Sequence, residues 1–496
     1  MYNSILQFNE KCSERLEKIV NLVLNGEADF NDLTSAVQEE VLQLGTGIVK
    51  EVIEETDKLI KESVERKREY IVERKSETKQ ILDVMGTISY SRTGYVSKKT
   101  GEYIYLVDRV MGINPHQRLT LSAAARTIEE AIETSYSKGG SNASIADGTS
   151  KQAVKELIHT IKIESPHKEL IEKKKMKHLH IVADEDHVSA QFWEKRGDLG
   201  KDILGRKVNT IMPKIICLYE DIIDTAKENS GNHRSKLTGK HYFGGVYEGT
   251  VKNEDLWQEV QDYIDDVYDE ETLKKVYIAG DGAGWIKAGI KVVDKSVFVL
   301  DKFHMMKYIN KATVHLWDSV DDVKELIWDA IDTADKQAIE DITAQILCVT
   351  KSENKAAEVK DMRNYLINNW DGIKIRSTDR GGCWPCCAEA QVSHVLSDRM
   401  SSRPMGWSKL GCDQMTKLRA YISNKGKVID LLKKQQEELL IEAKEEIKKV
   451  ALKTLKIKQK AYRNIDTLNV NIPGINNSNM DWLRGIVNGG FNLGNI

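Results

Sequence analysis

The sequence predicts an α/β protein built on a mixed sheet, and two observations carry this prediction. Residues 178–310 contain short apolar runs in the order of three strands, a helix, a strand, a helix and a strand. Three of these runs, "HLHIVAD", "KVYIAGD" and "SVFVLD", end in an aspartate. This order of elements is that of an RNase H-like core. Helical periodicity at 310–380 then predicts an all-helical insertion into that core.

The composition is ordinary for a globular protein, with 41% hydrophobic and 30% charged residues. No apolar run reaches the roughly 18 residues of a membrane span, and "MYNSILQFNEKCSERLEK" lacks the features of a signal peptide. We therefore expect a cytoplasmic protein with no membrane partner. The odd count of seven cysteines fits reduced thiols better than a disulfide framework. The net charge of −3 neither indicates nor excludes a nucleic-acid partner.

The N-terminal region changes its period once. Residues 1–80 place apolar residues three and four apart, which predicts helix. "GTISYSR" and "GEYIYLVD" then alternate apolar and polar residues around the turn-like "SKKTG", so residues 86–108 are predicted to form a β-hairpin. Arg92, Lys98 and Lys99 would lie on or near the tip of this hairpin. We expect them to contact DNA.

Residues 118–162 return to helical periodicity. "LTLSAAARTIEEAIETSYSKGG" predicts a helix that stops at Gly-Gly, followed by a short helix, a glycine turn and a second helix capped by Thr149 or Ser150. This is the pattern of a helix-turn-helix, although a plain helical hairpin has the same one. In the DNA-binding interpretation, base and phosphate contacts come from the first turns of the second helix, at Lys151, Gln152 and Lys155.

The pattern divides the chain into six predicted regions. They are an N-terminal helical region (1–80), a hairpin and helix-turn-helix region (81–165), the first part of the core (175–310), the helical insertion (311–382), the second part of the core (383–412) and a helical, basic C-terminal region (413–496).

Three carboxylates can meet only through this fold. In the predicted order the first and fourth strands are neighbours, so Asp184 and Asp281 can face one edge of the sheet, and Glu389 on a later helix can complete the site. Oxygen ligands of this kind suit Mg²⁺ or Mn²⁺ rather than zinc. Two such ions can support phosphodiester chemistry. A single aspartate at a strand end is usually structural, but the combined order favours a metal site.

Several residues near these carboxylates have two interpretations. Trp285 could stack on a base or pack in the core. Arg399 and Arg403 could clamp phosphate, since arginine matches phosphate bidentately. "ADEDH" leaves the first carboxylate open between Asp184 and Asp186, which strand alternation would point to the same face.

Other motifs indicate what the chain lacks. "GDGAGW" does not match a dinucleotide fingerprint and no Walker A sequence occurs, so we expect no nucleotide cofactor. "CWPCC" supplies Cys383, Cys386 and Cys387. It lacks the second pair of ligands that a tetrahedral zinc site needs, although His394 could join it. Buried thiols are the favoured interpretation.

Four segments carry a family resemblance that spans nearly the whole chain. "HIVADEDHV", "YIAGDGAGWIK", "LDKFHMMKYI" and "AEAQVSHVLSDRMSSRPMGWS" resemble transposases of bacterial insertion sequences of the ISLre type, in the Mutator-like branch of DDE transposases. The resemblance implies an RNase H-like core with a catalytic and metal-binding triad at Asp184, Asp281 and Glu389. It favours Asp184 over Asp186, which then becomes a supporting residue. It also implies a Cys-or-Asp, two residues, His signature, here Asp301 and His304.

The resemblance implies a function as well. Such an enzyme binds the terminal inverted repeats of an insertion sequence and catalyses DNA strand cleavage and strand transfer with two Mg²⁺ or Mn²⁺ ions. Its partners are double-stranded DNA and at least a second copy of the chain, because two ends must be joined. The alternatives are a nuclease with the same core that cuts without joining, and a domesticated DNA-binding protein without catalysis.

Overall fold

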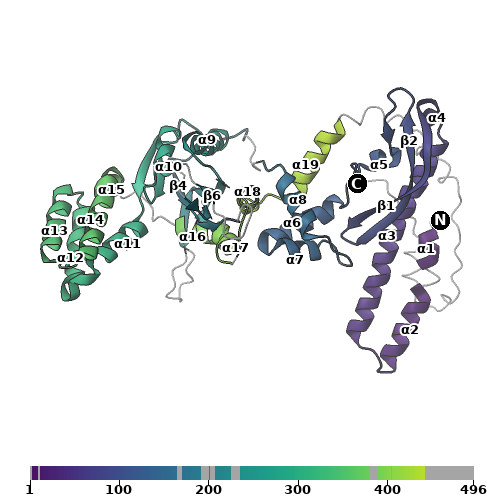
Figure 1. Ribbon diagram of the computed structural model, residues 1–496, viewed down its shortest axis with the longest axis horizontal. Coiled ribbons are helices and arrows are strands. Elements are labelled where there is room, and N and C mark those ends of the chain that lie inside the picture. Colours follow the sequence, from purple (N-terminus) through teal and green to yellow (C-terminus); the bar gives the residue numbers. More distant parts are fainter. Residues whose placement is uncertain are drawn as a thin grey trace. The chain divides into compact units, whose positions relative to one another are not determined.

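The protein is a mixed α/β structure of two compact units (Figure 1). The computed structural model describes residues 3–8, 12–164, 170–191, 200–201, 207–224, 235–379, 388–403 and 405–441. Unit 1 comprises Met1–Ile81, Thr87–Arg118 and Gln436–Ile496, and unit 2 comprises Leu82–Gly86 and Leu119–Gln435. Among the helices in these described ranges, none is long and apolar enough to cross a membrane.

Unit 1 begins with helices, as the sequence predicts. They are α1 (Asn3–Gln7), α2 (Ser13–Leu24), α3 (Phe30–Glu62) and α4 (Val64–Glu69). A reciprocal capping box between Asp29 and Asp32 starts α3. The prediction of helix up to residue 80 is wrong from Tyr70, where strand β1 (Tyr70–Asp83) begins. The charged residues of β1 interrupt the alternation of apolar and polar residues that indicates a strand. Pairing with the next strand then favours the extended conformation.

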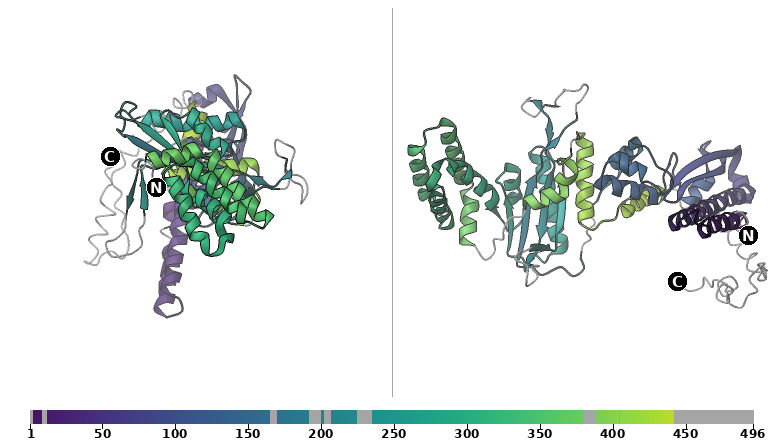
Figure 2. Two further views of the ribbon diagram at one scale, coloured as in Figure 1. Left: turned by 90° about the vertical axis from the view of Figure 1, so that its left-hand side faces the viewer. Right: turned by 90° about the horizontal axis from the view of Figure 1, so that it is seen from below.

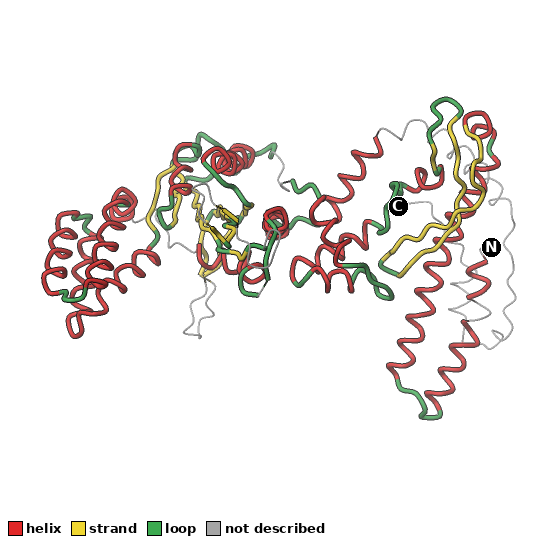
Figure 3. Tube along the Cα trace, in the orientation of Figure 1, coloured by secondary structure: helices red, strands yellow, loops and turns green. Residues whose placement is uncertain are grey.

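The sheet of unit 1 has the order β1-β2-β3, with β2 at Gly86–Ser97 and β3 at Tyr103–Ile104. The predicted hairpin is confirmed by the antiparallel pairing of Tyr95 with Ile104. It is short, because the chain turns into α5 (Leu106–Met111) two residues later. The longer hairpin is formed by β1 and β2, which run side by side in Figure 3.

Unit 2 begins with three helices, α6 (Leu121–Glu133), α7 (Tyr136–Ser141) and α8 (Lys151–Thr160). Ser150 rather than Thr149 caps α8, since its side chain accepts the N–H of Ala153. The glycine pair does not stop a helix but lies inside α7. A Cβ on Gly140 would lie 2.3 Å from the Thr149 carbonyl oxygen, so glycine permits this close packing.

The main sheet of unit 2 has the order β12-β9-β4-β13-β14. Its strands are β4 (His178–Glu185), β9 (Lys214–Tyr219), β12 (His241–Gly245), β13 (Lys275–Gly280) and β14 (Ser296–Leu300). The pairs β12–β9 and β9–β4 are antiparallel, whereas β4–β13 and β13–β14 are parallel. The predicted neighbourhood of the first and fourth strands is therefore confirmed. Helices α9 (Thr250–Val267) and α10 (Gly284–Ala288) connect the last three strands.

Shorter strands surround this sheet. The second apolar run of the predicted core, "TIMPKIICLYEDI", forms β8 (Thr210–Ile211), β9 and β10 (Asp221–Asp224) instead of a single strand. The short strands are β5 (Val188–Ser189), β6 (Gly200–Lys201), β7 (Lys207–Val208), β8 (Thr210–Ile211), β10 (Asp221–Asp224) and β11 (Ser235–Thr238).

The segment after β14 is helical, as predicted for an insertion. It contains α11 (Lys302–Thr313), the turn η3 (Val314–Ser319), α12 (Val320–Asp332), α13 (Lys336–Val349), α14 (Glu353–Asn368) and α15 (Trp370–Thr378). These helices gather at the β14 end of the sheet (Figure 2). The chain then returns through α16 (Ala388–Val392), η4 (Ser393–Ser397), α17 (Asp398–Met400), α18 (Lys409–Ser423) and α19 (Val428–Ile441).

Each face of the main sheet joins a separate apolar cluster. The insertion face, which includes Ile181 and Ile278, packs with α9 and the insertion helices. The α18 face, which includes Val182 and Ala279, packs with α6, α8, α16 and α18. Covering on both faces explains why the central strands read as nearly continuous apolar runs.

Candidate active site

Three aspartates continue the α18 face of the sheet beyond its apolar residues. In β13 the side chains of Val276 and Ile278 join the insertion face, whereas Tyr277 and Ala279 join the α18 face. Because side chains alternate along a strand, Asp281 follows Ala279 on the α18 face. The same alternation places Asp184 two residues after Val182 and Asp301 two residues after Val299.

The strand register aligns these aspartates in one row. Val182 of β4 pairs with Ala279 of β13, and Gly280 pairs with Leu300 of β14. Continuing the register therefore places Asp281 between Asp184 and Asp301. Neighbouring strands lie about 4.8 Å apart. The row lies at the carboxyl ends of parallel strands, where α/β sheets commonly bind ligands.

Glu389 reaches the same place from a different part of the chain. Its helix α16 packs against β4 and β9, and the flanking Ala388 and Val392 belong to the apolar cluster of the α18 face. Glu389 itself is exposed. Its negative charge helps to raise the pKa of Asp184, which means that the two carboxylates are close enough to interact.

Asp184 is the most perturbed carboxyl of this group. Burial is the main cause that raises its pKa to about 6, and the negative charges of Asp281 and Glu389 raise it further. The N–H of Glu185, 2.8 Å from Oδ1, and the His304 ring act in the opposite direction. Like charges therefore converge on a partly buried position, as is common where a protein binds a cation or performs chemistry.

The insertion helices hold Asp281 in place. Its Oδ1 accepts the N–H of Ala283 at 2.8 Å, and its carbonyl oxygen accepts the hydroxyl of Tyr365 in α14, also at 2.8 Å. Gly282 follows with a φ of +93°, and a Cβ there would lie 2.3 Å from Oδ1 of Asn369. The glycine after Asp281 in "GDGAGW" therefore permits a left-handed turn against the insertion.

Asp301 and His304 form a pair beside this row. The sequence places them at a strand end, whereas in the structure Asp301 caps α11 and His304 lies in the first turn of that helix. Asp301 is 3% exposed, its Oδ1 accepts the N–H of Phe303 at 3.1 Å, and its Oδ2 lies 2.8 Å from Nδ1 of His304. The bond to Asp301 is the main cause that raises the pKa of His304, and Asp184 and Asp281 add to it.

Asp186 points to a different neighbour. Asp186 lies one residue beyond β4, and its two carboxylate oxygens have partners outside the row. Its Oδ2 accepts the hydroxyl of Ser397 at 3.0 Å, and its Oδ1 accepts the N–H of His187. Of the two aspartates in "ADEDH", Asp184 is the one that the strand register places in the row.

The three carboxylates Asp184, Asp281 and Glu389 fit a hard divalent cation by their chemistry. They offer only oxygen ligands, and their mutual repulsion, seen in the raised pKa of Asp184, is what a cation would relieve. Throughout the residues that the structure describes, however, no three His, Cys, Asp or Glu side chains are arranged to hold a metal ion. The donor chemistry fits, whereas a finished ligand arrangement is not formed.

Two residues expected to contact DNA are core residues instead. Trp285 is 8% exposed and packs against Trp257, so the core interpretation is correct. Arg399 is 2% exposed, donates from Nε to the carbonyl of Ala131 at 3.2 Å and lies over the ring of Trp407. Burial lowers the pKa of its guanidinium to about 10. The expectation of a phosphate clamp at Arg399 is therefore wrong for this conformation.

Of the other basic residues expected to contact DNA, some are exposed and one is largely buried. Arg403 is exposed, with Nη1 3.4 Å from the carbonyl oxygen of Thr134. In unit 1, Lys98 and Lys99 are exposed at the turn between β2 and β3. Arg92 is not at the tip, because its side chain is 11% exposed and pairs with Asp108 and Glu77.

Asp108 was missed by sequence reasoning because its partners are distant along the chain. It is 5% exposed and accepts hydrogen bonds from Lys79 at 3.2 Å and Tyr90 at 2.9 Å, besides the Arg92 contact. A buried carboxylate is stable only when it is paired in this way. The group is therefore structural.

Helix α8 keeps its predicted basic residues on the surface. Lys151, Gln152 and Lys155 are exposed, whereas Val154 and Ile158 are fully buried. The helix thus presents one polar face, on which Gln152 donates to Glu156 at 3.2 Å. Cys383, Cys386 and Cys387 lie outside the described residues.

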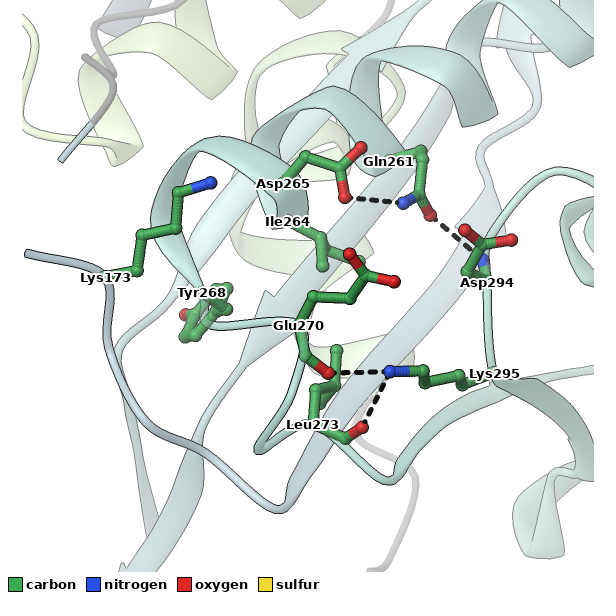
Figure 4. Close-up of a pocket in the computed structure, with 9 residues that line it drawn as sticks. All are labelled: Lys173, Gln261, Ile264, Asp265, Tyr268, Glu270, Leu273, Asp294 and Lys295. Carbon is green, nitrogen blue, oxygen red and sulfur yellow. Dashed lines mark hydrogen bonds between the residues drawn. The ribbon is translucent and has the colours of Figure 1, made fainter.

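A separate cavity of about 210 Å³ lies at the opposite end of the strands (Figure 4). Leu273 and Lys295, which line it, precede β13 and β14, whereas the aspartate row follows these strands. Burial chiefly raises the pKa of Asp265 in this cavity, and the charges of Asp294 and Glu270 add to it. Lys173 and Lys295 offset this acidic character. The cavity is therefore distinct from the candidate site.

Comparisons with known proteins identify relatives but no activity. UPF0236 protein TTE0402 of Caldanaerobacter subterraneus subsp. tengcongensis is 36% identical over 422 residues, which are 85% of this chain and 80% of the relative. UPF0236 protein TTE2489 of the same organism is 35% identical over 84% of this chain and 83% of its own. A third relative, 35% identical over 83% of this chain and 82% of its own, bears a name that joins eleven TTE designations.

A chain of the Drosophila P element transposase strand transfer complex aligns with 66% of this chain and 82% of its own at 10% identity, with a TM-score of 0.20. A score this low carries no argument about the fold. The model of the uncharacterised protein family UPF0236 matches residues 23–437, most of the sequence. Together with the relatives, this match shows that the chain belongs to the UPF0236 family.

Proposed function

We propose that this protein is a DNA transposase with an RNase H-like catalytic core. The observation that carries the proposal is the in-register row of Asp184, Asp281 and Asp301, together with Glu389 on α16. The strand order β12-β9-β4-β13-β14 also supports it, because three antiparallel strands followed by two parallel ones is the arrangement of an RNase H-like sheet. The helical segment between the second and third carboxylates is the expected insertion.

The chemistry consists of two displacements at phosphorus. Water attacks a phosphodiester at the transposon end, a new P–O bond forms, and the 3′ oxygen leaves as a hydroxyl. That hydroxyl then attacks a target phosphodiester, whose own 3′ oxygen leaves. When bound, two Mg²⁺ or Mn²⁺ ions supply charge stabilisation to the attacking and leaving oxygens. Asp184, Asp281 and Glu389 would hold them.

Asp301 and His304 have a positioning role in this proposal. Asp301 fixes the imidazole through Nδ1 and favours its protonated form. A cationic ring beside the acidic row can stabilise negative charge on DNA phosphate. A direct Mg²⁺–imidazole bond is disfavoured, because Mg²⁺ prefers oxygen ligands.

The relatives' names give independent support. One relative's name joins eleven designations and another's joins four, all with the same prefix and from one organism. We interpret these joined designations as several copies of one gene in that organism. A DNA segment that moves or copies itself produces that distribution, whereas an ordinary enzyme gene does not need it.

The proposed partners are duplex DNA and a second copy of the chain. Strand transfer joins two ends in one complex, which requires at least a dimer. The exposed face of α8 is the proposed reader of end DNA, because its Lys151, Gln152 and Lys155 lie in the first turns of a capped helix.

The test is a cleavage and strand-transfer assay with labelled end DNA and Mg²⁺. Asp281→Ala should abolish cleavage and leave end binding nearly unchanged, because phosphate contacts elsewhere dominate affinity. Asp294→Ala, a carboxylate at the opposite end of the sheet, is the matched control and should cut normally. Normal cutting by Asp281→Ala would refute the site. If the wild type cuts end DNA but does not join it to target DNA, the protein is a nuclease. If it binds end DNA without cutting it, the protein is a non-catalytic DNA-binding protein.

A further inference from the structure

Helix α11 and the turn η3 carry exposed apolar residues that begin beside the candidate site. Phe303 and Met306 lie on α11 and are 46% and 42% exposed, and Val314 and Trp317 lie in the following turn η3 and are 61% and 87% exposed. These four residues are called the stripe. The ring of Phe303 packs edge-on against His304, with centroids 5.5 Å apart. Phe303 therefore lies beside the Asp301–His304 pair, and α11, labelled in Figure 1, leads from there into the insertion.

Trp317 is held in the solvent at a conformational cost. Its φ is 51° and its ψ is −117°, a region that a bulky side chain rarely adopts. Backbone strain of this kind is found where the surrounding structure imposes it, commonly at binding sites. The Trp317 side chain is 87% exposed, so burial does not offset this backbone cost.

Charge decides what kind of partner fits this stripe. Helix α11 has Lys302, Lys307 and Lys311 and no acidic side chain between its ends. The next helix, α12, has five acidic residues and one lysine. Helix α11, which starts at the site, is therefore cationic, and one of its lysines, Lys311, lies 3.8 Å from Glu358 of α14. Lysines interleaved with exposed aromatic and apolar side chains form the surface that binds unpaired nucleotides, through phosphate contacts and base stacking.

We propose that this stripe binds unpaired nucleotides of the DNA strand whose phosphate lies at the aspartate row, with Trp317 stacking on a base. The proposal rests on the proposed function and names the DNA form held beside its site. From Phe303 to its end at Thr313 the helix rises about 15 Å, which matches roughly four stacked nucleotides, and Trp317 lies beyond that end. An intact duplex hides its base faces, so the stripe can engage only DNA that has opened.

The experiment measures binding by the full chain without divalent metal, so that cutting does not interfere. The probes are a fluorescein-labelled duplex with a short single-stranded extension and the same duplex fully paired. Trp317→Ala should weaken binding of the extended probe about 10-fold, the loss expected for one stacked base, and change the paired probe by less than about twofold. Trp317→Phe should recover most of the affinity. Because Trp317 is exposed, neither change should unfold the chain.

The matched controls are exposed apolar residues on other helices. Leu326→Ala on α12 and Phe30→Ala on α3, which are 53% and 73% exposed before substitution, should bind both probes like the wild type. Equal affinity of Trp317→Ala and these controls for the extended probe would overturn the proposal. So would a shift from dimer to monomer in Trp317→Ala with unchanged DNA binding, because the stripe would then be an interface between copies.

The outcomes separate this inference from the proposed function. If the wild type cuts DNA and Trp317→Ala binds the extended probe normally, the stripe does not bind nucleotides. The transposase proposal would still stand. Selective loss of binding in Trp317→Ala, with no cutting by the wild type, would leave the nucleotide-binding stripe in place and refute the catalytic proposal.

Discussion

At the residue scale, the electrostatic cost of the candidate site falls on Asp184. Burial and the charges of Asp281 and Glu389 raise the pKa of its carboxyl to about 6, from an ordinary value of 3.8. Below pH 3.8 the carboxyl is protonated whether the chain is folded or not. Between pH 3.8 and about 6 the folded protein binds more protons than the unfolded chain, so stability falls as pH rises through this window.

Asp184→Asn should therefore stabilise the protein while removing its activity. We expect a gain of about 1 kcal/mol at pH 8, typical of relaxing a functional site, and almost none at pH 4. The measurement is the melting temperature with EDTA at both pH values. Mg²⁺ should raise the melting temperature of the wild type and not of Asp184→Asn, since bound ligand stabilises the folded state. A loss of stability at pH 8 would contradict a raised pKa of Asp184 in the folded protein.

His304 gives the second prediction at this scale. Its raised pKa means that protonated His304 stabilises the fold below pH 6.5, and this contribution disappears as pH rises through the raised value. His304→Ala should therefore destabilise the protein more at pH 6 than at pH 9. It should also slow cleavage by about 10–100-fold, as expected when support around a metal site is lost.

Asp301→Asn separates the two roles of this pair. Asparagine can still cap α11 at the N–H of Phe303, but it removes the charge that favours protonated His304. Cleavage should fall as in His304→Ala while the helix remains intact. If His304→Ala loses cleavage as completely as Asp281→Ala, the imidazole is a direct metal ligand. If His304→Ala and Asp301→Asn both cleave at the wild-type rate, Asp301 and His304 serve only to cap α11.

At the element scale, the sequence predicted those features that depend on local pattern. Apolar runs located the five strands, and Ser150 was one of two expected caps of α8. The strand β1 was missed because charged residues interrupt its alternation and its pairing with β2 is tertiary. Arg92 and Arg399 were assigned to DNA because their partners, Asp108 and the Ala131 carbonyl, come from elements that periodicity does not bring near them.

The prediction at this scale concerns α8 as a reader of DNA. If the exposed Gln152 pairs with an adenine, Gln152→Ala should reduce discrimination at that position by roughly 1–3 kcal/mol. Lys155→Ala should instead weaken binding to all sequences and flatten the salt dependence, because it removes a phosphate contact. Competition binding with end DNA and random duplex checks both. If Gln152→Ala discriminates between end DNA and random duplex as the wild type does, α8 does not read bases through Gln152 and is part of a plain helical hairpin.

At the scale of the whole molecule, the candidate site is a product of topology rather than of any local motif. Asp184, Asp281 and Asp301 align only because β4, β13 and β14 are adjacent and parallel in a fixed register. Glu389 joins them only because α16 packs back against β4. The sequence could therefore predict which residues meet once the strand order was assumed, whereas the preference for Asp184 within "ADEDH" rested on the family resemblance.

The division into two units leads to the last prediction. Unit 1 has its own apolar core and the buried carboxylate Asp108, and unit 2 has the two clusters on its main sheet. Asp108→Asn leaves Lys79 and Arg92 without their shared anion, at a cost of about 3 kcal/mol. Leu366→Ala in α14 removes a fully buried side chain at a cost of about 2–5 kcal/mol. In scanning calorimetry each variant should lower one unfolding transition by on the order of 10 °C and leave the other in place. If both variants instead lower one common transition, the chain unfolds as one cooperative body. A destabilising change in unit 1 would then also destabilise the aspartate row in unit 2.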